Sequence, residues 1–204
     1  TDDRTSNTVA IITKPWNGLS GVVGYSANGG EKPDNSSSGN TRNINNNAFT
    51  AGINYTGYGV TAGYAYINAQ NPQNNIIVDT GVAAGNFNDE LNAHRLAAKY
   101  DFGQGTVISG LYDYQKLDYE TTSNNYLRRN VWALGASHKI GANRLWLEYA
   151  KAGDLHNRDG GVADTNAYQR TLGYAYSLSQ RTTLKAYNTD LSNDTSVRYG
   201  FYNN

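Results

Sequence analysis

The chain has 204 residues and a formal net charge of zero, from 17 basic and 17 acidic side chains. This length suits one domain, and the absence of a basic run gives no reason to expect nucleic acid as a partner. The sequence contains no Cys, which excludes disulfides, thiol catalysis and Cys-based zinc sites within it.

No stretch of this sequence approaches the roughly 18 consecutive apolar residues that a membrane helix requires. The longest apolar run is residues 9–12, the size of a strand segment. A chain this polar would normally be soluble. One class is an exception, because a closed sheet in a bilayer presents only every second residue to lipid and keeps a low mean hydropathy.

Period-two alternation predicts about ten strands and almost no helix. In chain order the predicted strands cover residues 7–14, 19–27, 47–56, 59–68, 93–102, 105–117, 129–140, 143–153, 167–178 and 182–190. Most are about ten residues long, the length with which a tilted strand crosses a hydrocarbon core. Strands of soluble proteins average five or six residues, so strand length favours a membrane sheet.

The connections between these strands alternate between tight and long. The tight ones are residues 14–18, 56–59, 102–105, 140–143 and 178–181, and four of them contain the Gly or Asn that short hairpins favour. The long polar ones are 26–46 and 69–92, with shorter ones near 117–128 and 153–166. An antiparallel meander puts all tight turns at one end, which is typical of outer-membrane barrels.

The alternation also predicts which residues share a face. In the strand at 93–102, Leu96, Ala98 and Tyr100 alternate with Arg95, Ala97, Lys99 and Asp101. The phase of the strands at 7–14, 105–117 and 182–190 is ambiguous. We expect charges on the polar face to line a water-filled interior, the alternative for each being simple solvation. They are Arg95, Lys99, Asp101, Arg144, Glu148 and, with unsettled phase, Asp113 and Lys185.

Aromatic residues concentrate toward strand ends, which predicts a girdle at each membrane interface. The girdle residues are Tyr25, Tyr55, Tyr58, Tyr64, Tyr66, Tyr100, Phe102, Tyr112, Tyr114, Tyr149, Tyr174 and Tyr176. The alternative is a soluble all-β binding module, a sandwich whose apolar faces pack on each other.

Two segments carry a family resemblance. "RTSNTVAIITKPWNGLSGVVGYS" at 4–26 and "YQRTLGYAYSLSQRTTLKAYNTDLSND" at 168–194 resemble hairpins of the Gram-negative general porins. The resemblance implies an all-β, transmembrane antiparallel up-and-down β-barrel of sixteen strands in the bacterial outer membrane. It also implies a homotrimer in contact with membrane lipid and lipopolysaccharide. Small hydrophilic solutes and ions would diffuse passively through such a channel, without catalysis or a cofactor.

The same resemblance implies that residues 1–204 are part of a single barrel domain, about strands six to fifteen. The N-terminal strands, the constriction loop and the final strand would lie outside this sequence. A self-contained barrel of about ten strands is the alternative.

One segment offers catalytic chemistry. In "GDLHNRDGG" at 153–161, Asp154, His156 and Asp159 lie close in sequence, so an outer-membrane hydrolase could use an acid/His pair there to activate water. The competing interpretation is a solvated loop. We predict no metal site, since hard cations need more converging oxygens than this spacing ensures.

Overall fold

A computed structural model of the chain describes residues 7–27, 47–70, 90–119, 125–197 and 199. These ranges contain twelve β-strands, and no helix in them could span a membrane. The strands are β1 (Thr8–Ile12), β2 (Leu19–Ser26), β3 (Ala48–Gly57), β4 (Val60–Gln70), β5 (Glu90–Asp101), β6 (Thr106–Tyr119), β7 (Asn125–Ile140), β8 (Asn143–Ala152), β9 (Leu155–Asn157), β10 (Gly160–Val162), β11 (Ala167–Ser177) and β12 (Thr183–Asn193).

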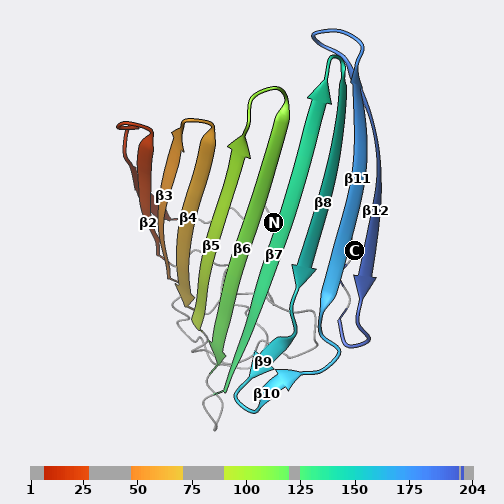
Figure 1. The fold of residues 1–204 in the computed structure, drawn as a ribbon. Helices are drawn as coiled ribbons and strands as arrows, with labels where there is room; N and C mark the ends of the chain where they lie inside the picture. Colours follow the sequence, from red (N-terminus) through yellow and green to blue (C-terminus); the bar gives the residue numbers. More distant parts are fainter. Residues whose placement is uncertain (1–6, 28–46, 71–89, 120–124, 198, 200–204) are drawn as a thin grey trace, which may run out of the picture.

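Ten of the strands form one continuous antiparallel meander. Its spatial order, β1-β2-β3-β4-β5-β6-β7-β8-β11-β12, follows the chain, with β9 and β10 as a small hairpin off this path. All the tight turns lie at one end of the sheet, the upper end in Figure 1, which we call the turn end; the opposite end is the loop end. The predicted all-β, up-and-down fold is therefore confirmed.

All ten predicted strands are present, but some bounds differ. β7 begins at Asn125, four residues before the predicted start, and β5 begins at Glu90 instead of residue 93. The segment 153–166, predicted as a loop, contains β9 and β10. β9 pairs with β7, with His156 opposite Arg128. It therefore lies beside β7 just beyond the end of β8. The predicted loops at 26–46 and 69–92 lie almost wholly outside the described residues.

The tight turns require residues that can adopt the left-handed backbone conformation. Between β3 and β4, Tyr58 and Gly59 both have positive φ, 51° and 77°, as a two-residue hairpin turn with the twist of its strands requires. A Cβ on Gly59 would lie 2.6 Å from the carbonyl oxygen of Asp101, so only glycine fits against the neighbouring strand. Tyr58 adopts the same left-handed backbone region, which is sterically unfavourable for a residue with a side chain but not for glycine.

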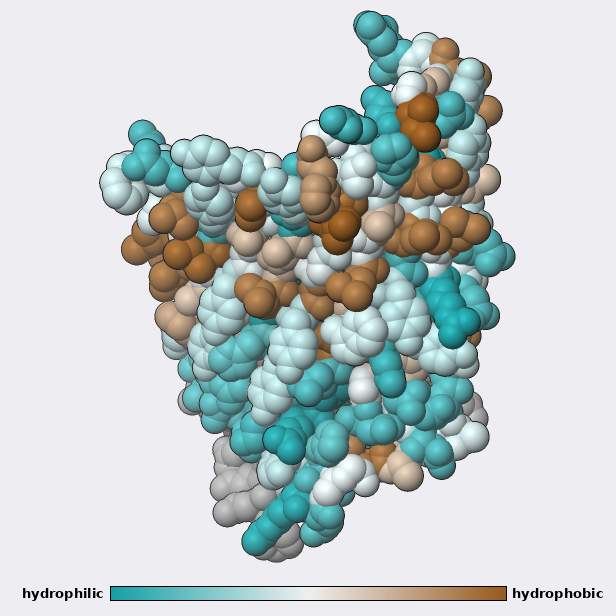
Figure 2. Space-filling view, in the orientation of Figure 1, coloured by the Kyte–Doolittle hydropathy of each residue, from teal (hydrophilic) through white to brown (hydrophobic). Residues whose placement is uncertain are grey.

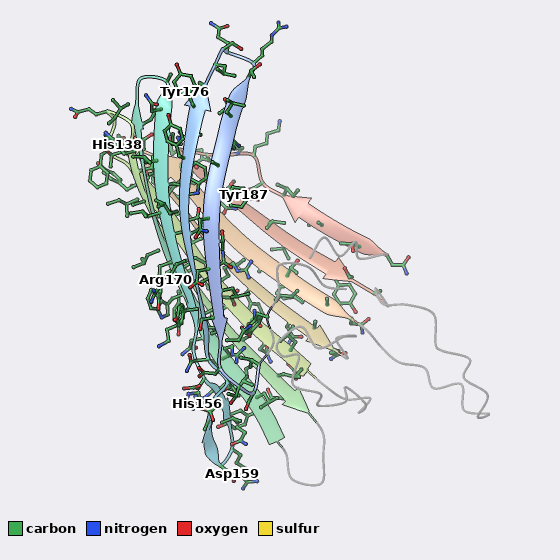
Figure 3. All side chains as sticks on the ribbon, turned by 90° about the vertical axis from the view of Figure 1, so that its right-hand side faces the viewer. His138, His156, Asp159, Arg170, Tyr176 and Tyr187 are labelled. Atoms are coloured by element: carbon green, nitrogen blue, oxygen red, sulfur yellow. The ribbon has the colours of Figure 1, made fainter. Side chains whose placement is uncertain are left out.

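The sheet is strongly curved (Figure 3), and its described residues form only a small buried hydrophobic cluster around Leu91 and Leu155. Figure 3 views it from the β12 edge, with His138, Arg170 and Tyr176 on the convex side. The only buried hydrophobic residues in the described ranges are Leu91, Leu127, Leu155, Ala167, Ala175 and Val197. Within those ranges β1 and β12 are not paired with each other, so both edges of the sheet are open.

Candidate functional site

The convex face carries the aliphatic side chains of the meander. The register aligns Ala136, Leu147 and Leu172 across β7, β8 and β11, and Leu134 is the next residue of this face along β7. Leu96 is 53%, Tyr100 43%, Leu134 59% and Leu147 59% exposed. Figure 2 shows this face as a brown band across the strands, bordered by paler and teal residues. A sandwich would bury these side chains between two layers, so the alternative of a soluble sandwich is wrong for the described strands.

The aromatic residues predicted as girdles lie on the same face or in its turns. Tyr55, Tyr100, Tyr174 and Tyr176 lie near the turn ends of their strands, with Tyr58 and Phe102 just beyond strand ends. Tyr25, Tyr64, Tyr66, Tyr112, Tyr114 and Tyr149 lie in the middle or loop-end part of theirs.

Several of these rings contact one another. Tyr100 and Phe102 meet edge to face with centroids 4.6 Å apart. The Tyr64 hydroxyl lies 2.7 Å from His94 Nδ1, and the ring of Tyr66 lies 4.9 Å from that of His94. The Tyr64 hydroxyl thus has a partner while its ring stays exposed. Such amphipathic rings suit the boundary between hydrocarbon and water.

The concave face is built mainly from small and polar side chains, with Leu111, Trp146 and Tyr187 among its larger ones. At mid-height it forms a hollow of about 480 Å³, lined by Gly63, Ala97, Ala133, Gly135 and Ala150 with Lys99 and Glu148 among them. On this face the ring of Trp146 covers Gly173, where a Cβ would come within 1.9 Å of the ring. Small residues leave the centre of the concave face unfilled, as a channel wall requires and a folded core does not.

All seven charges predicted to face an interior lie on the concave face by register. Arg95 lies opposite Asp113 and forms an ion pair with it, in which Nε, at 2.8 Å, and Nη2 both donate to Asp113 Oδ2. Lys99 lies opposite Ser109, Asp101 opposite Val107, and Glu148 opposite Gly135 and Thr171. The register thereby resolves the phase of Asp113 and Lys185, which alternation alone left open. Their role as pore-lining charges is a proposal.

Three cations form a row on the concave face near the turn end. Lys139 lies directly opposite Arg144, Arg144 lies opposite Ala175, and Ala175 lies opposite Lys185. All three cations are exposed, and none makes an ion pair among the described residues. Like charges directly opposite each other destabilise a sheet. We call Lys139, Arg144 and Lys185 the inner basic row.

One concave-face cation was missed by the sequence analysis. Arg129 is 3% exposed and donates from Nη2 to the carbonyl oxygen of Thr165. Thr165 in turn accepts from the backbone N–H of Leu155 at 2.8 Å and donates to the Val162 carbonyl at 2.7 Å. These bonds hold the β8–β11 connection against the sheet. Arg129 precedes Ala133 by four residues, so the two-residue periodicity of a strand would have placed both on this face.

The connection does not assemble the predicted acid/His pair. Asp154 accepts from the backbone N–H of Thr165 at 3.3 Å, and Asp159 donates its backbone N–H to Asn157. His156 has no hydrogen bond to a carboxylate in the described part of the chain. Figure 3 shows His156 and Asp159 on the β9–β10 hairpin at the loop end. The described residues contain no cluster suited to a metal ion.

Comparisons with known proteins agree with this architecture. A family model described as Gram-negative porin matches residues 1–196. A porin structure refined at 1.8 Å is 15% identical; the match covers 92% of this chain and 56% of that one, with a TM-score of 0.60. The in-vitro folded trimer form of OmpT, an outer membrane protein of Vibrio cholerae, is 13% identical over 91% of this chain and 54% of that one, with a TM-score of 0.66. The chain therefore spans little more than half the length of these structures. A search of curated proteins found no match.

Proposed function

Because the chain belongs to the Gram-negative porin family, a family of the bacterial outer membrane, we propose that it forms part of a water-filled channel. Small hydrophilic solutes and ions would diffuse through it passively. The observation that carries this proposal is the division of the sheet into an apolar convex face and a small, polar concave face. In a membrane barrel, lipid would contact the apolar convex face and water would contact the polar concave face.

The open edges of the sheet support a larger barrel. In the described residues, β1 and β12 each have a strand partner on one side only, and backbone groups left without a partner in hydrocarbon would cost several kcal/mol each. We therefore propose that the described strands belong to a single closed barrel domain completed by further strands. The sixteen-stranded barrel with a constriction loop that the resemblance implies would supply them.

The same proposal assigns partners to the convex face and to the loop end of the barrel. Membrane lipid would cover the convex band, and lipopolysaccharide would surround the loop end, because long loops of outer-membrane barrels face outward. A homotrimer is supported by the likeness to the trimer form of OmpT. Passive diffusion through such a channel needs no catalytic step and no cofactor.

Planar-bilayer recording on the intact protein tests the channel. We expect stepwise current increases whose conductance follows the bulk conductivity of the salt solution, since ions cross through water. A preparation shown by circular dichroism to be folded, and shown to be inserted in liposomes, that gives no steps would contradict the proposal.

A further inference from the structure

A second group of cations lies on the convex face, at the loop end. Lys116, Arg128, Lys151 and Arg170 come from β6, β7, β8 and β11, which are consecutive neighbours in the sheet. Lys116 lies directly opposite Arg128, and Lys151 lies diagonally from Arg170. We call these four residues the outer basic strip. It lies on the opposite side of the sheet from the inner basic row and at the opposite end.

The strip begins where the apolar band ends. Arg170 is opposite Tyr149, and the next convex-face residue toward the turns is Leu172. Lys151 is flanked by Trp132 on β7 and Tyr168 on β11. On β7 and β8, the convex face therefore runs from leucine through an aromatic ring to a cation toward the loop end, whereas on β11 Arg170 follows Leu172 directly and Tyr168 lies beyond it. This is the order of acyl chain, interface and headgroup in a bilayer leaflet.

The protein leaves part of this charge uncompensated. Lys116 pairs with Asp118 at 2.7 Å, but Lys151 and Arg170 make no ion pair among the described residues. The Arg170 guanidinium instead lies over the Tyr168 ring, 4.7 Å from its centroid. Two further carboxylates share this face with Asp118: Asp190 lies opposite Arg170, and Glu90, which lies opposite Asp118, accepts hydrogen bonds from Asn68 and Asn92. Neither carboxylate pairs with a strip cation.

We infer that Lys151 and Arg170, flanked by Arg128 and Lys116, bind the phosphate groups of the lipid A part of lipopolysaccharide. The inference rests on the proposed function, because it requires the convex face to lie in the membrane with the loop end outward. Phosphate oxygens next to the aromatic belt would provide the charge-assisted partners that the protein lacks. The rings of Trp132, Tyr149 and Tyr168 would contact the sugar and the upper acyl chains.

Binding of lipid A to the intact detergent-solubilised protein, measured by native mass spectrometry, tests this site. The probes are diphosphorylated lipid A and the same lipid with both phosphates removed. The test variant is Lys151→Gln with Arg170→Gln. The matched control, Lys14→Gln with Arg181→Gln, removes one Lys and one Arg from exposed positions at the turn end. We expect the test variant to bind diphosphorylated lipid A about tenfold more weakly, and the control to bind like the parent.

Each result has one meaning. A parent that binds both lipids equally, or a test variant that binds like the parent, overturns the phosphate site. If the test variant does not fold, binding of both lipids to the parent is measured at increasing salt concentration. Only the phosphate-dependent part of the binding should weaken with salt. Conductance is recorded on the same preparations. Channel steps without phosphate-dependent binding would overturn this inference alone, whereas absent steps in the folded parent would overturn the proposed function.

Discussion

Replacing Lys139, Arg144 and Lys185 together by Glu is expected to shift the ion preference of the proposed channel away from anions and toward cations. These three cations lie side by side on the concave face near the turn end, with only Ala175 between two of them. The other described strand cations of this face are Arg95, which is paired with Asp113, Arg129, which is buried, and Lys99. Asp101 is the one described carboxylate of this face near the turn end, so the three cations of the inner basic row leave this end of the face with a net positive charge.

Coulomb's law sets the size of the effect. A unit charge about 10 Å from a permeating ion contributes about 0.4 kcal/mol in water, so reversing three charges changes the ion's energy by about 2.5 kcal/mol before screening. Salt at 0.1 M has a Debye length of about 10 Å and reduces this considerably. We expect the chloride-to-potassium permeability ratio, taken from reversal potentials, to fall by about tenfold at low salt and less at 1 M.

A charge reversal on the other face is the control for this experiment. Lys151→Glu with Arg170→Glu changes the protein's net charge in the same direction, but these residues lie on the convex face. Its reversal potential should stay close to that of the parent. A triple Glu variant that conducts with an unchanged reversal potential would show that the inner basic row does not face the permeating ions.

Replacing Leu147 by Arg is expected to destabilise the folded protein in lipid by about 2–4 kcal/mol, the cost of an Arg on the lipid face near the bilayer midplane. Leu147 is 59% exposed and lies between Ala136 and Leu172 on the convex face. In a soluble protein, a change at such an exposed site would usually stay within about 0.5 kcal/mol. The measurement is the free energy of unfolding by guanidinium in lipid vesicles.

Thr171→Arg provides the matched comparison. Thr171 lies opposite Glu148 on the concave face, where a new guanidinium would meet water and a carboxylate. We expect its unfolding free energy to change by less than about 1 kcal/mol. Equal losses in the two variants would mean that both faces have the same surroundings, which the proposed channel does not allow.

The two-residue alternation predicted most of the sheet because each strand has two different surroundings. Where an apolar residue must alternate with a polar one, as in Leu96 to Asp101, the phase can be read without a structure. In strands with polar residues on both faces, the alternation did not show which residues lie on which face. In β12, Asn188 and Asp190 share the convex face with Leu184, and pairing with β11 was needed to assign Lys185.

The loop end was less predictable for the same reason. Beyond the aromatic residues both faces meet water, so the pair Arg128–Arg129 shows no alternation, although β7 continues to Asn125. β9 and β10 have three residues each, and their place depends on Arg129 and Thr165, which are 36 residues apart. Contacts of this range leave no periodic signal in the sequence.

Cysteine labelling at two adjacent positions tests the division of the sheet most directly. Leu147 and Glu148 are consecutive and both exposed, and they lie on opposite faces. The 204-residue sequence contains no Cys, so Leu147→Cys and Glu148→Cys each introduce a single thiol into it. In lipid vesicles, we expect a membrane-impermeant thiol reagent to modify Cys at 148 at least about tenfold faster than Cys at 147, since a thiolate forms readily only in water. Equal rates, or faster reaction at 147, would contradict a wet concave face and a lipid-covered convex one.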